Sequence, residues 1–144
     1  MTYKNPINVC VVCLPVNMPD GITSWLLVRR NNEPCKGELS FPGGYQNEGD
    51  SMRVAAAREL EEECGLKISP FSLTFINEKL NKANRNLSFW LADAMNYYDL
   101  FDADGVYKHP IQEEEVMEVI VWNYEDKLCF PFHQEVLEEL VAVM

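Results

Sequence analysis

GYQNEGDSMRVAAARELEEECGL, residues 44–66, is the stretch that decides both the fold and the chemistry expected of this chain. On an α-helix, an advance of about 100° per residue places Glu62 and Glu63 on either side of Glu59, while Glu61 points to the other side. Like charges at this spacing repel one another, so folding stability alone does not favour the cluster. We therefore predict that a divalent cation compensates the repulsion, with a solvated acidic helix face as the alternative.

The residues flanking the acidic cluster predict where its helix begins and ends. Asp50 and Ser51 are favourable N-cap residues, and Gly65 suits the left-handed conformation that often ends a helix. The helix is therefore expected over about residues 51–64. Ahead of it, residues 41–44 (FPGG) are expected to interrupt regular structure and to let backbone approach a ligand closely.

The spacing of these residues is similar to a known signature. Gly44, then Asp50, then RELEEECGL at residues 58–66 resembles the Nudix box, with Asp50 in place of the family's glutamate. The resemblance implies an α+β fold, a Nudix-type α/β/α sandwich with a mixed β-sheet. It also implies Mg²⁺-dependent hydrolysis of a phosphoanhydride bond in a nucleoside diphosphate linked to a further group, with Mn²⁺ as the alternative metal.

The resemblance also implies roles, position by position. Metal ions held by the carboxylates would neutralise the pyrophosphate and lower the pKa of a bound water, which attacks phosphorus. Arg58 would orient the carboxylates by ion pairing, and Gly44 could offer its backbone carbonyl to a metal. The implied residues are the metal ligands Glu59, Glu62, Glu63 and Gly44, of which Glu59 and Glu62 are also expected to be catalytic, and the supporting residues Arg58, Asp50 and Gly43.

A general base would complete the proton transfer. In many members of the family another glutamate follows the box, in a loop or strand, and residues 112–118 (QEEEVME) provide several here. Glu115 and Glu118 are the candidates for this base. The alternative is an acidic segment that protects the start of a strand.

Basic residues are scarce, so those near the predicted site are informative. Arg29 and Arg30 end a predicted strand before the box, and either could pair with a phosphate of the substrate. Ordinary solvation of the strand end is the alternative. His133, within PFHQ, is similar to a histidine in the branch of the family that resembles ADP-ribose pyrophosphatases, although a lone histidine is more often a capping or packing residue.

The box does not determine the substrate, because specificity depends on loops outside it. An ADP-ribose-like compound, or another nucleotide sugar or dinucleotide, is the first expectation. The alternatives are a house-cleaning (d)NTP pyrophosphohydrolase and a non-catalytic metabolite-sensing module with the same fold. The complete set of Glu59, Glu62 and Glu63 favours an enzyme, since a sensor does not need all the metal ligands.

Composition sets limits on organisation and partners. The 144 residues, 47% of them hydrophobic, are expected to form one domain over residues 1–144. A formal net charge of −11 opposes binding to long DNA or RNA, whereas a small nucleotide can bind where metal ions supply positive charge. No signal peptide and no membrane-length apolar run are expected, which indicates a cytoplasmic protein without a membrane partner. A homodimer is left open.

The five cysteines are odd in number and irregularly spaced. Cys10 and Cys13 form a CxxC pattern, but they lie in a predicted strand, where residues three apart face opposite sides. Neither a zinc pair nor a thioredoxin-type motif is therefore expected. All five cysteines are expected to be buried, reduced thiols.

Hydrophobic periodicity predicts the remaining elements. Strands are expected over residues 9–16, 24–29, 72–80 and 87–94 and in a run ending at residue 122, with hairpins joining the first two and the next two. An amphipathic helix is expected over residues 134–143. The tyrosines and phenylalanine of the long connection over residues 95–114 are expected to fold it onto the body of the protein, with stacking on a base as the alternative.

Overall fold

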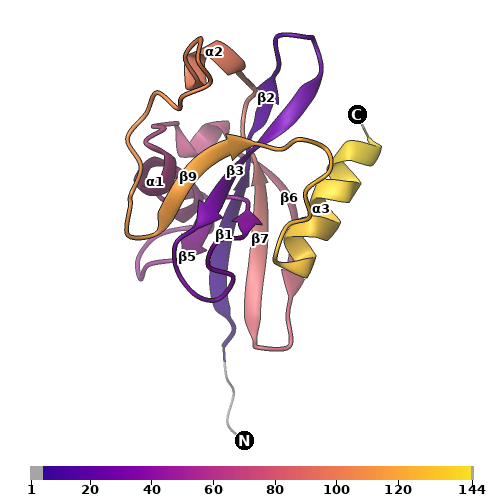
Figure 1. Ribbon diagram of the computed structural model, residues 1–144. Helices are drawn as coiled ribbons and strands as arrows, with labels where there is room; N and C mark the ends of the chain where they lie inside the picture. Colours follow the sequence, from indigo (N-terminus) through magenta and orange to yellow (C-terminus); the bar gives the residue numbers. More distant parts are fainter. Residues whose placement is uncertain (1–4, 144) are drawn as a thin grey trace, which may run out of the picture.

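Two β-sheets lie between two helices in the computed structural model, which describes residues 5–143 (Figure 1). Helix α1 (Met52–Cys64) covers one side and helix α3 (Pro131–Ala142) the other. The predicted α/β/α sandwich of the α+β class is therefore confirmed.

The first sheet is mixed, as expected. Its strand order is β5 (Gly43–Tyr45), β1 (Ile7–Cys13), β7 (Arg85–Leu91) and β6 (Thr74–Leu80). Strands β1 and β7 are parallel, whereas β5 pairs with β1 and β6 pairs with β7 in the antiparallel sense. The β6–β7 pair confirms the second predicted hairpin, and a short 3₁₀ helix, η1 (Pro70–Ser72), leads into it.

The second sheet is built around β3 (Thr23–Arg30). One edge of β3 pairs with β2 (Pro15–Asn17) and β4 (Leu39–Ser40), the other edge pairs with β9 (Val116–Val121), and β2 also pairs with β8 (Met95–Asn96). The β2–β3 pair confirms the first predicted hairpin. The single strand predicted over residues 9–16 is wrong in one respect, because the chain passes from the first sheet to the second at Leu14, just before a proline that has no N–H for a ladder.

Alternation along β1 divides the interior into two cores. Cys10 and Val12 face α1 and pack in the same cluster as Leu60, while Val11 and Cys13 face α3 and pack with Leu137. This is the expected result of a period of two along a strand. The two cysteines of the CxxC pattern thus lie on opposite faces, as predicted.

Two local predictions need correction. Residues 41–44 do not simply interrupt regular structure, because Gly43–Tyr45 forms β5 and pairs with β1. The C-terminal helix begins at Pro131, three residues before the predicted start, since proline is favourable in the first turn of a helix. The apolar stripe of that helix is confirmed, with Val136 and Leu137 fully buried.

The long connection after β8 contains a short helix, α2 (Tyr97–Leu100), and folds onto the protein body as expected. The rings of Tyr97 and Phe101 stack with centroids 4.9 Å apart, and Phe101 is buried in the core on the α1 side. The Tyr107 hydroxyl donates a hydrogen bond of 2.6 Å to the Cys64 carbonyl. These aromatic residues stabilise the connection.

The expectation of five reduced cysteines is wrong for two of them. Cys35 and Cys129 form a disulfide, with Cα atoms 6.2 Å apart. Their pairing depends on two loops that meet only in the folded chain, so no local pattern indicates it. Cys10, Cys13 and Cys64 are buried free thiols, and burial raises the pKa of each.

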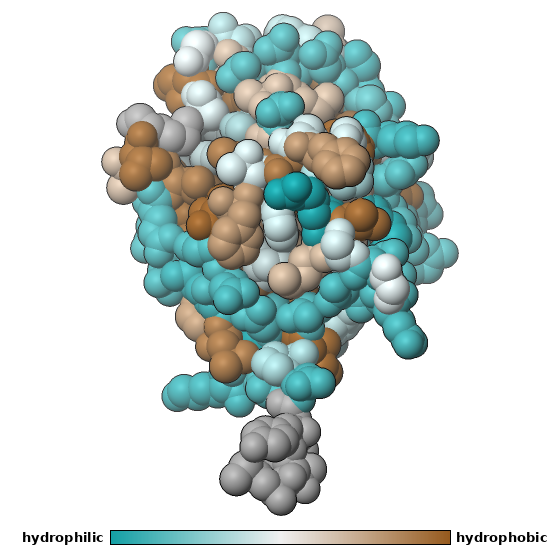
Figure 2. Space-filling model, turned by 180° about the vertical axis from the view of Figure 1, so that it is seen from behind, coloured by the Kyte–Doolittle hydropathy of each residue, from teal (hydrophilic) through white to brown (hydrophobic). Residues whose placement is uncertain are grey.

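Hydrophilic side chains surround the apolar ones on the face seen from behind (Figure 2). The exposed large apolar side chains include Phe71 and Phe75. Among the described residues no helix combines the length and apolar character needed to cross a membrane.

Candidate functional site

Helix α1 positions the acidic cluster, and both of its ends are defined by side-chain or backbone chemistry. The Ser51 hydroxyl accepts a hydrogen bond from the Val54 N–H, and Gly65 ends the helix with φ of 69°. The predicted boundaries are thus confirmed, with Ser51 rather than Asp50 as the N-cap. Buried alanines at Ala55 and Ala56 let the helix pack closely against the first sheet, so its carboxylates lie beside β1 and β5.

Two carboxylates of this helix are buried. Glu59 is 8% exposed and Glu63 is 6% exposed. An oxygen of each lies within 4.8 Å of an oxygen of Glu115. Glu115 is distant in the sequence and lies just before β9. Burial raises the pKa of Glu63 well above its usual value, and repulsion from Glu59 adds to the effect. Burial likewise raises the pKa of Glu59, against the opposing influence of Arg58.

Arg58 bridges the buried Glu59 and the more exposed Glu62 of the same helix. Its Nη1 lies 3.1 Å from Glu59 and 3.2 Å from Glu62, and its Nη2 donates to the Tyr45 carbonyl. Asp50 lies 3.6 Å from the Arg58 Nε. The Glu62 side chain is 45% exposed, so it lies at the rim rather than with the buried pair. The shorter Asp50 still reaches the guanidinium, in a supporting position.

The glycine pair before the helix is explained by close packing. A Cβ on Gly44 would lie 2.5 Å from the Glu59 carboxyl carbon, and a Cβ on Gly43 would lie 2.5 Å from the Cys10 carbonyl oxygen. The Gly43 N–H also donates to Glu63 at 3.3 Å. A side chain at either position would therefore displace β5 or a carboxylate.

The carboxylates open onto a cleft of about 660 Å³ between the two sheets and α3. Arg30 lines the same cleft, with its guanidinium 5.0 Å from the centre of the Phe130 ring. At another part of the wall, Arg85 lies 6.0 Å from the centre of the Tyr45 ring. The cleft thus combines an acidic end with cationic and aromatic walls, and its volume is typical of small-ligand sites.

His133 lines the cleft as a packing residue. It is buried, and its Nδ1 accepts a hydrogen bond of 3.2 Å from the Phe41 N–H. Burial lowers its pKa to about 3, so the ring stays neutral at physiological pH. The His133 ring packs against the aromatic rings of Phe41, Phe89 and Phe130.

Two pairs of candidate residues were predicted from the sequence, Arg29 with Arg30 and Glu115 with Glu118. In each pair the structure places one residue at the cleft and the other away from it. Among the described residues, Arg30 and Glu115 line the cleft, whereas Arg29 and Glu118 do not. The last two pair with each other instead, at 2.7 Å. A register shift in the β3–β9 ladder, as at a β-bulge, lies between Arg29 and Arg30 and accompanies the different directions of their side chains. The catalytic or binding roles of these residues stay predictions.

Two aromatic residues that line the cleft, Tyr45 and Phe130, were not predicted from the sequence. Tyr45 lies inside the quoted stretch, and Phe130 precedes the proline that begins α3. An exposed aromatic residue within a glycine-rich turn is a weak signal for Tyr45. For Phe130 no local signal exists, because only the path of the chain before α3 brings it to Arg30.

The donor set fits a divalent cation. Buried carboxylates that repel one another are costly unless a cation or protons compensate them, and hard oxygen ligands suit small divalent metals. Glu59, Glu63 and Glu115 could hold such an ion together. The absence of a nearby histidine or thiolate ligand in this trio disfavours softer metals.

Comparison with known sequences gives a family. A family model described as NUDIX domain matches residues 6–140. An ADP-ribose pyrophosphatase of Methanocaldococcus jannaschii is 44% identical over 41 residues, 28% of this chain and 24% of that protein. The human 8-oxo-dGDP phosphatase NUDT18 is 32% identical over 72 residues, 50% of this chain and 22% of that protein. The matched stretches therefore span about a quarter of the length of these relatives.

Solved structures show the same fold. The NUDIX domain of Shewanella oneidensis NrtR, in a complex with ADP ribose, matches with a TM-score of 0.76 and 20% identity, covering 98% of this chain and 90% of that one. An Ap4A hydrolase of C. elegans matches with a TM-score of 0.68 and 19% identity, covering 94% of this chain and 96% of that one. With the family model covering nearly all of the described residues, the chain belongs to the Nudix family.

Proposed function

We propose that this protein is a Nudix pyrophosphohydrolase that cleaves a phosphoanhydride bond in a nucleoside diphosphate linked to a further group, with an ADP-ribose-like compound as the preferred substrate. The observation that carries the proposal is the buried pair Glu59 and Glu63 with Glu115 beside it, at the acidic end of a ligand-sized cleft. A purely structural helix face would not bury two adjacent carboxylates.

Mg²⁺, or Mn²⁺ in its place, is the proposed cofactor. Glu59 and Glu63 would hold it, with Glu62 available at the rim and Glu115 beside them as the proposed base. When bound, the ion would neutralise pyrophosphate charge and acidify a water. Arg58 keeps Glu59 oriented through its 3.1 Å contact, so the ligand geometry is set before substrate arrives.

The remaining residues of the cleft would bind and position the substrate. Arg30, which lines the same cleft, can offset phosphate charge. The Phe130 and Tyr45 rings offer faces on which a base or ribose can pack. Glu115 is the proposed general base, since it is the solvent-exposed member of the trio and lies beside the two buried carboxylates.

The relatives support two substrate classes. The name of one relative refers to ADP-ribose, and a structural neighbour was crystallised with ADP ribose, which favours the first class. The similarity to an 8-oxo-dGDP phosphatase keeps a nucleoside di- or triphosphate as the second candidate. Because such nucleotides are cytoplasmic metabolites, we expect the protein to act there.

A substrate panel tests the proposal. Purified protein would be incubated with Mg²⁺ or Mn²⁺ and with ADP-ribose, nucleotide sugars, dinucleotides, (d)NTPs or 8-oxo-dGDP, and the products separated by chromatography. We expect ADP-ribose to yield AMP and ribose 5-phosphate. Glu63→Gln should lower turnover by roughly 100-fold or more, because it removes a ligand charge.

Glu61→Gln is the matched control, since Glu61 is an exposed glutamate of the same helix. Its turnover should equal that of the wild type. Glu63→Gln should also fold as stably as the wild type without metal, because it relieves repulsion from Glu59. If no compound is cleaved, or if Glu63→Gln cleaves as fast as the wild type, the proposed function is wrong.

A further inference from the structure

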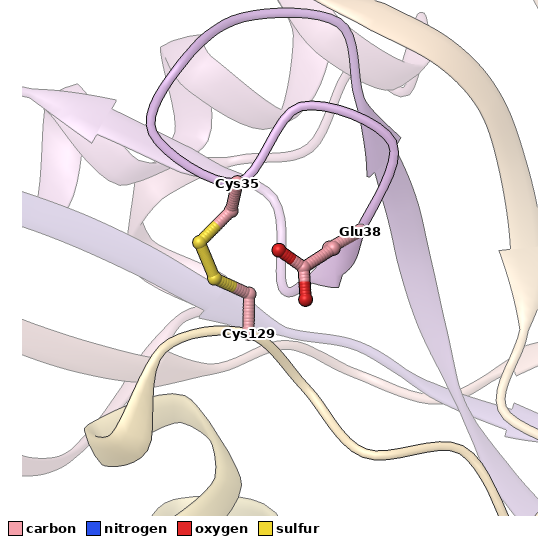
Figure 3. A group of neighbouring side chains, drawn as sticks. All are labelled: Cys35, Glu38 and Cys129. Atoms are coloured by element: carbon pink, nitrogen blue, oxygen red, sulfur yellow. A yellow bond between two sulfur atoms is a disulfide. The ribbon is translucent and has the colours of Figure 1, made fainter.

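The Cys35–Cys129 disulfide joins two segments that are far apart in the sequence. Cys35 lies in the connection between β3 and β4, and Cys129 lies in the segment that leads into α3 (Figure 3). The two residues are 94 positions apart, with Cα atoms at 6.2 Å. The bond therefore closes most of the chain into one covalent loop.

Both segments form walls of the cleft. The residues adjacent to Cys35, including Glu33 and Pro34, line it from one side. Phe130, which follows Cys129 directly, lines it from the other side. A change at the disulfide thus acts within one or two residues of the ligand-binding surface.

The tip of the β3–β4 connection is held by hydrogen bonds within the connection and to Arg30 beside it, whereas Asn31 at its start bonds to Glu113 and Glu115. Arg30 donates from Nε to the Pro34 carbonyl at 2.9 Å, and the Gly37 N–H donates to the Arg30 carbonyl at 2.7 Å. The Cys129 N–H donates to the Leu39 carbonyl at 2.9 Å, where the connection has already ended. The disulfide is therefore a major tie between the tip of the connection and the opposite wall.

Accessibility separates this pair from the other cysteines. Cys10, Cys13 and Cys64 are each 0% exposed, whereas Cys35 and Cys129 are half-buried. Small thiols in solution can therefore reach the pair but not the other three. The Glu38 carboxylate lies within 4.8 Å of both sulfurs and comes from the same connection as Cys35 (Figure 3).

We propose that the Cys35–Cys129 disulfide is a reversible redox modification site that fastens the two walls of the cleft. In the reducing direction, two molecules of a small thiol reduce the bond through a mixed disulfide, giving two protein thiols and one small-molecule disulfide. In the oxidising direction, a disulfide such as oxidised glutathione takes two electrons from the protein dithiol and leaves as two thiols. In the cytoplasm, the location expected under the proposed function, protein disulfides commonly have such a redox-responsive role.

The oxidised state holds the cleft in the geometry described above. Reduction removes the covalent tie between the β3–β4 connection and the segment before α3 and leaves the Cys129–Leu39 hydrogen bond and the Arg30–Phe130 contact, so the walls carrying Pro34 and Phe130 become more mobile. A ligand must then order them, which weakens its binding. The Glu38 carboxylate repels an approaching thiolate and so slows the reduction.

Alkylation and amide exchange test the site without reference to any activity. Without reductant, iodoacetamide should label none of the five cysteines of the native protein; after dithiothreitol, it should label Cys35 and Cys129 only. Hydrogen exchange measured by mass spectrometry should become faster over residues 31–38 and 123–130 on reduction. Labelling of Cys35 and Cys129 in the unreduced protein, or unchanged exchange after reduction, would overturn the proposal.

The effect on the cleft is measured with ADP-ribose as the probe and rests on the proposed function. Reduction should raise KM about fivefold or more, within the range of ordinary coupling between sites. The double variant C35S/C129S should have this raised KM with or without reductant; a variant that still responds to reductant would assign the effect to another cysteine. If ADP-ribose is not cleaved, the proposed function fails, and the redox site is then tested by cysteine labelling and hydrogen exchange alone.

Glu38→Gln provides a kinetic check that keeps both cysteines. Removal of the charge should speed reduction by dithiothreitol about threefold. The matched control is Glu48→Gln, an exposed glutamate in the loop before α1. It should leave the rate unchanged, and equal rates for both variants would contradict the role given to Glu38.

Discussion

Glu115 and Glu118 are three residues apart and chemically identical, yet only one lies with the buried carboxylates. Glu115 lies within 4.8 Å of Glu59 and Glu63, and Glu118 lies 2.7 Å from Arg29 on the β3–β9 ladder. The same separation applies to Arg30, which lines the cleft, and Arg29, which does not. Position relative to the sheet therefore assigns different chemistry to side chains of the same type.

This difference leads to a paired prediction. Glu115→Gln should lower turnover by about 100-fold or more, because general-base catalysis contributes that much. Glu118→Gln should keep turnover within about threefold of the wild type, since it removes only a half-exposed ion pair. Steady-state rates across a pH series would measure both. Equal losses in the two variants would show that Glu115 has no special role.

His133 is a second residue whose surroundings set its chemistry. Its pKa falls from 6.5 to about 3 in the folded protein, because burial disfavours the charged ring. Between these values the unfolded chain binds a proton that the folded protein does not. The contribution of His133 to stability should therefore fall as pH decreases from about 6.5 to about 3, by about 1.4 kcal/mol per pH unit.

Urea unfolding at several pH values, without metal, would measure this slope. His133→Gln should be less stable than the wild type at pH 7 by about 1–3 kcal/mol, since the Phe41 N–H depends on this acceptor, but its stability should decline less toward pH 4. His109→Gln is the control and should keep the wild-type slope. Parallel curves for wild type and His133→Gln would contradict the lowered pKa.

Strand β5 and helix α1 form the site as a unit. Their contact requires glycine at two successive positions, and each glycine faces a different neighbour. Gly43 packs on the β1 backbone, while Gly44 packs on the Glu59 carboxylate. The Nudix-box glycine is thus explained by the space that an ordered carboxylate needs, and not by an unusual backbone angle.

Alanine at each glycine should separate these roles. Gly44→Ala should displace Glu59 and lower turnover by at least about tenfold, with little change in Tm, because a side chain can move. Gly43→Ala should destabilise the protein by about 1–3 kcal/mol, because the Cβ meets the Cys10 carbonyl of β1. Calorimetry and turnover of both variants would test this; the reverse assignment of effects would show that the packing argument is wrong.

The α/β/α arrangement as a whole brings segments that are far apart in the sequence to one cleft. Helix α1 contributes the carboxylates, the end of β3 contributes Arg30, the segment before β9 contributes Glu115, and the segment before α3 contributes Phe130. The two cores on either side of β1 hold these segments in place. A disulfide then connects two of the cleft walls covalently.

Local sequence was sufficient for the helix and its carboxylates. The caps Ser51 and Gly65, the grouping of acidic side chains on one side of the helix and both hairpins follow from spacing and periodicity, which act over a few residues, whereas the sandwich class was implied by the resemblance to the Nudix family. Such signals can be read without knowledge of distant segments. The break at Leu14 and the strand at Gly43–Tyr45 were missed, because each depends on which sheet the segment joins.

The sequence by itself therefore determined the acidic helix, the family it indicates and the two-core alternation of β1. Only the tertiary structure decided that Glu115 rather than Glu118 joins the carboxylates, that Arg30 rather than Arg29 lines the cleft, and that Cys35 pairs with Cys129. The physical reason is range: helix and strand periodicity is set by neighbouring residues, whereas these choices depend on strand register, a β-bulge and the paths of loops that meet only after the chain has folded.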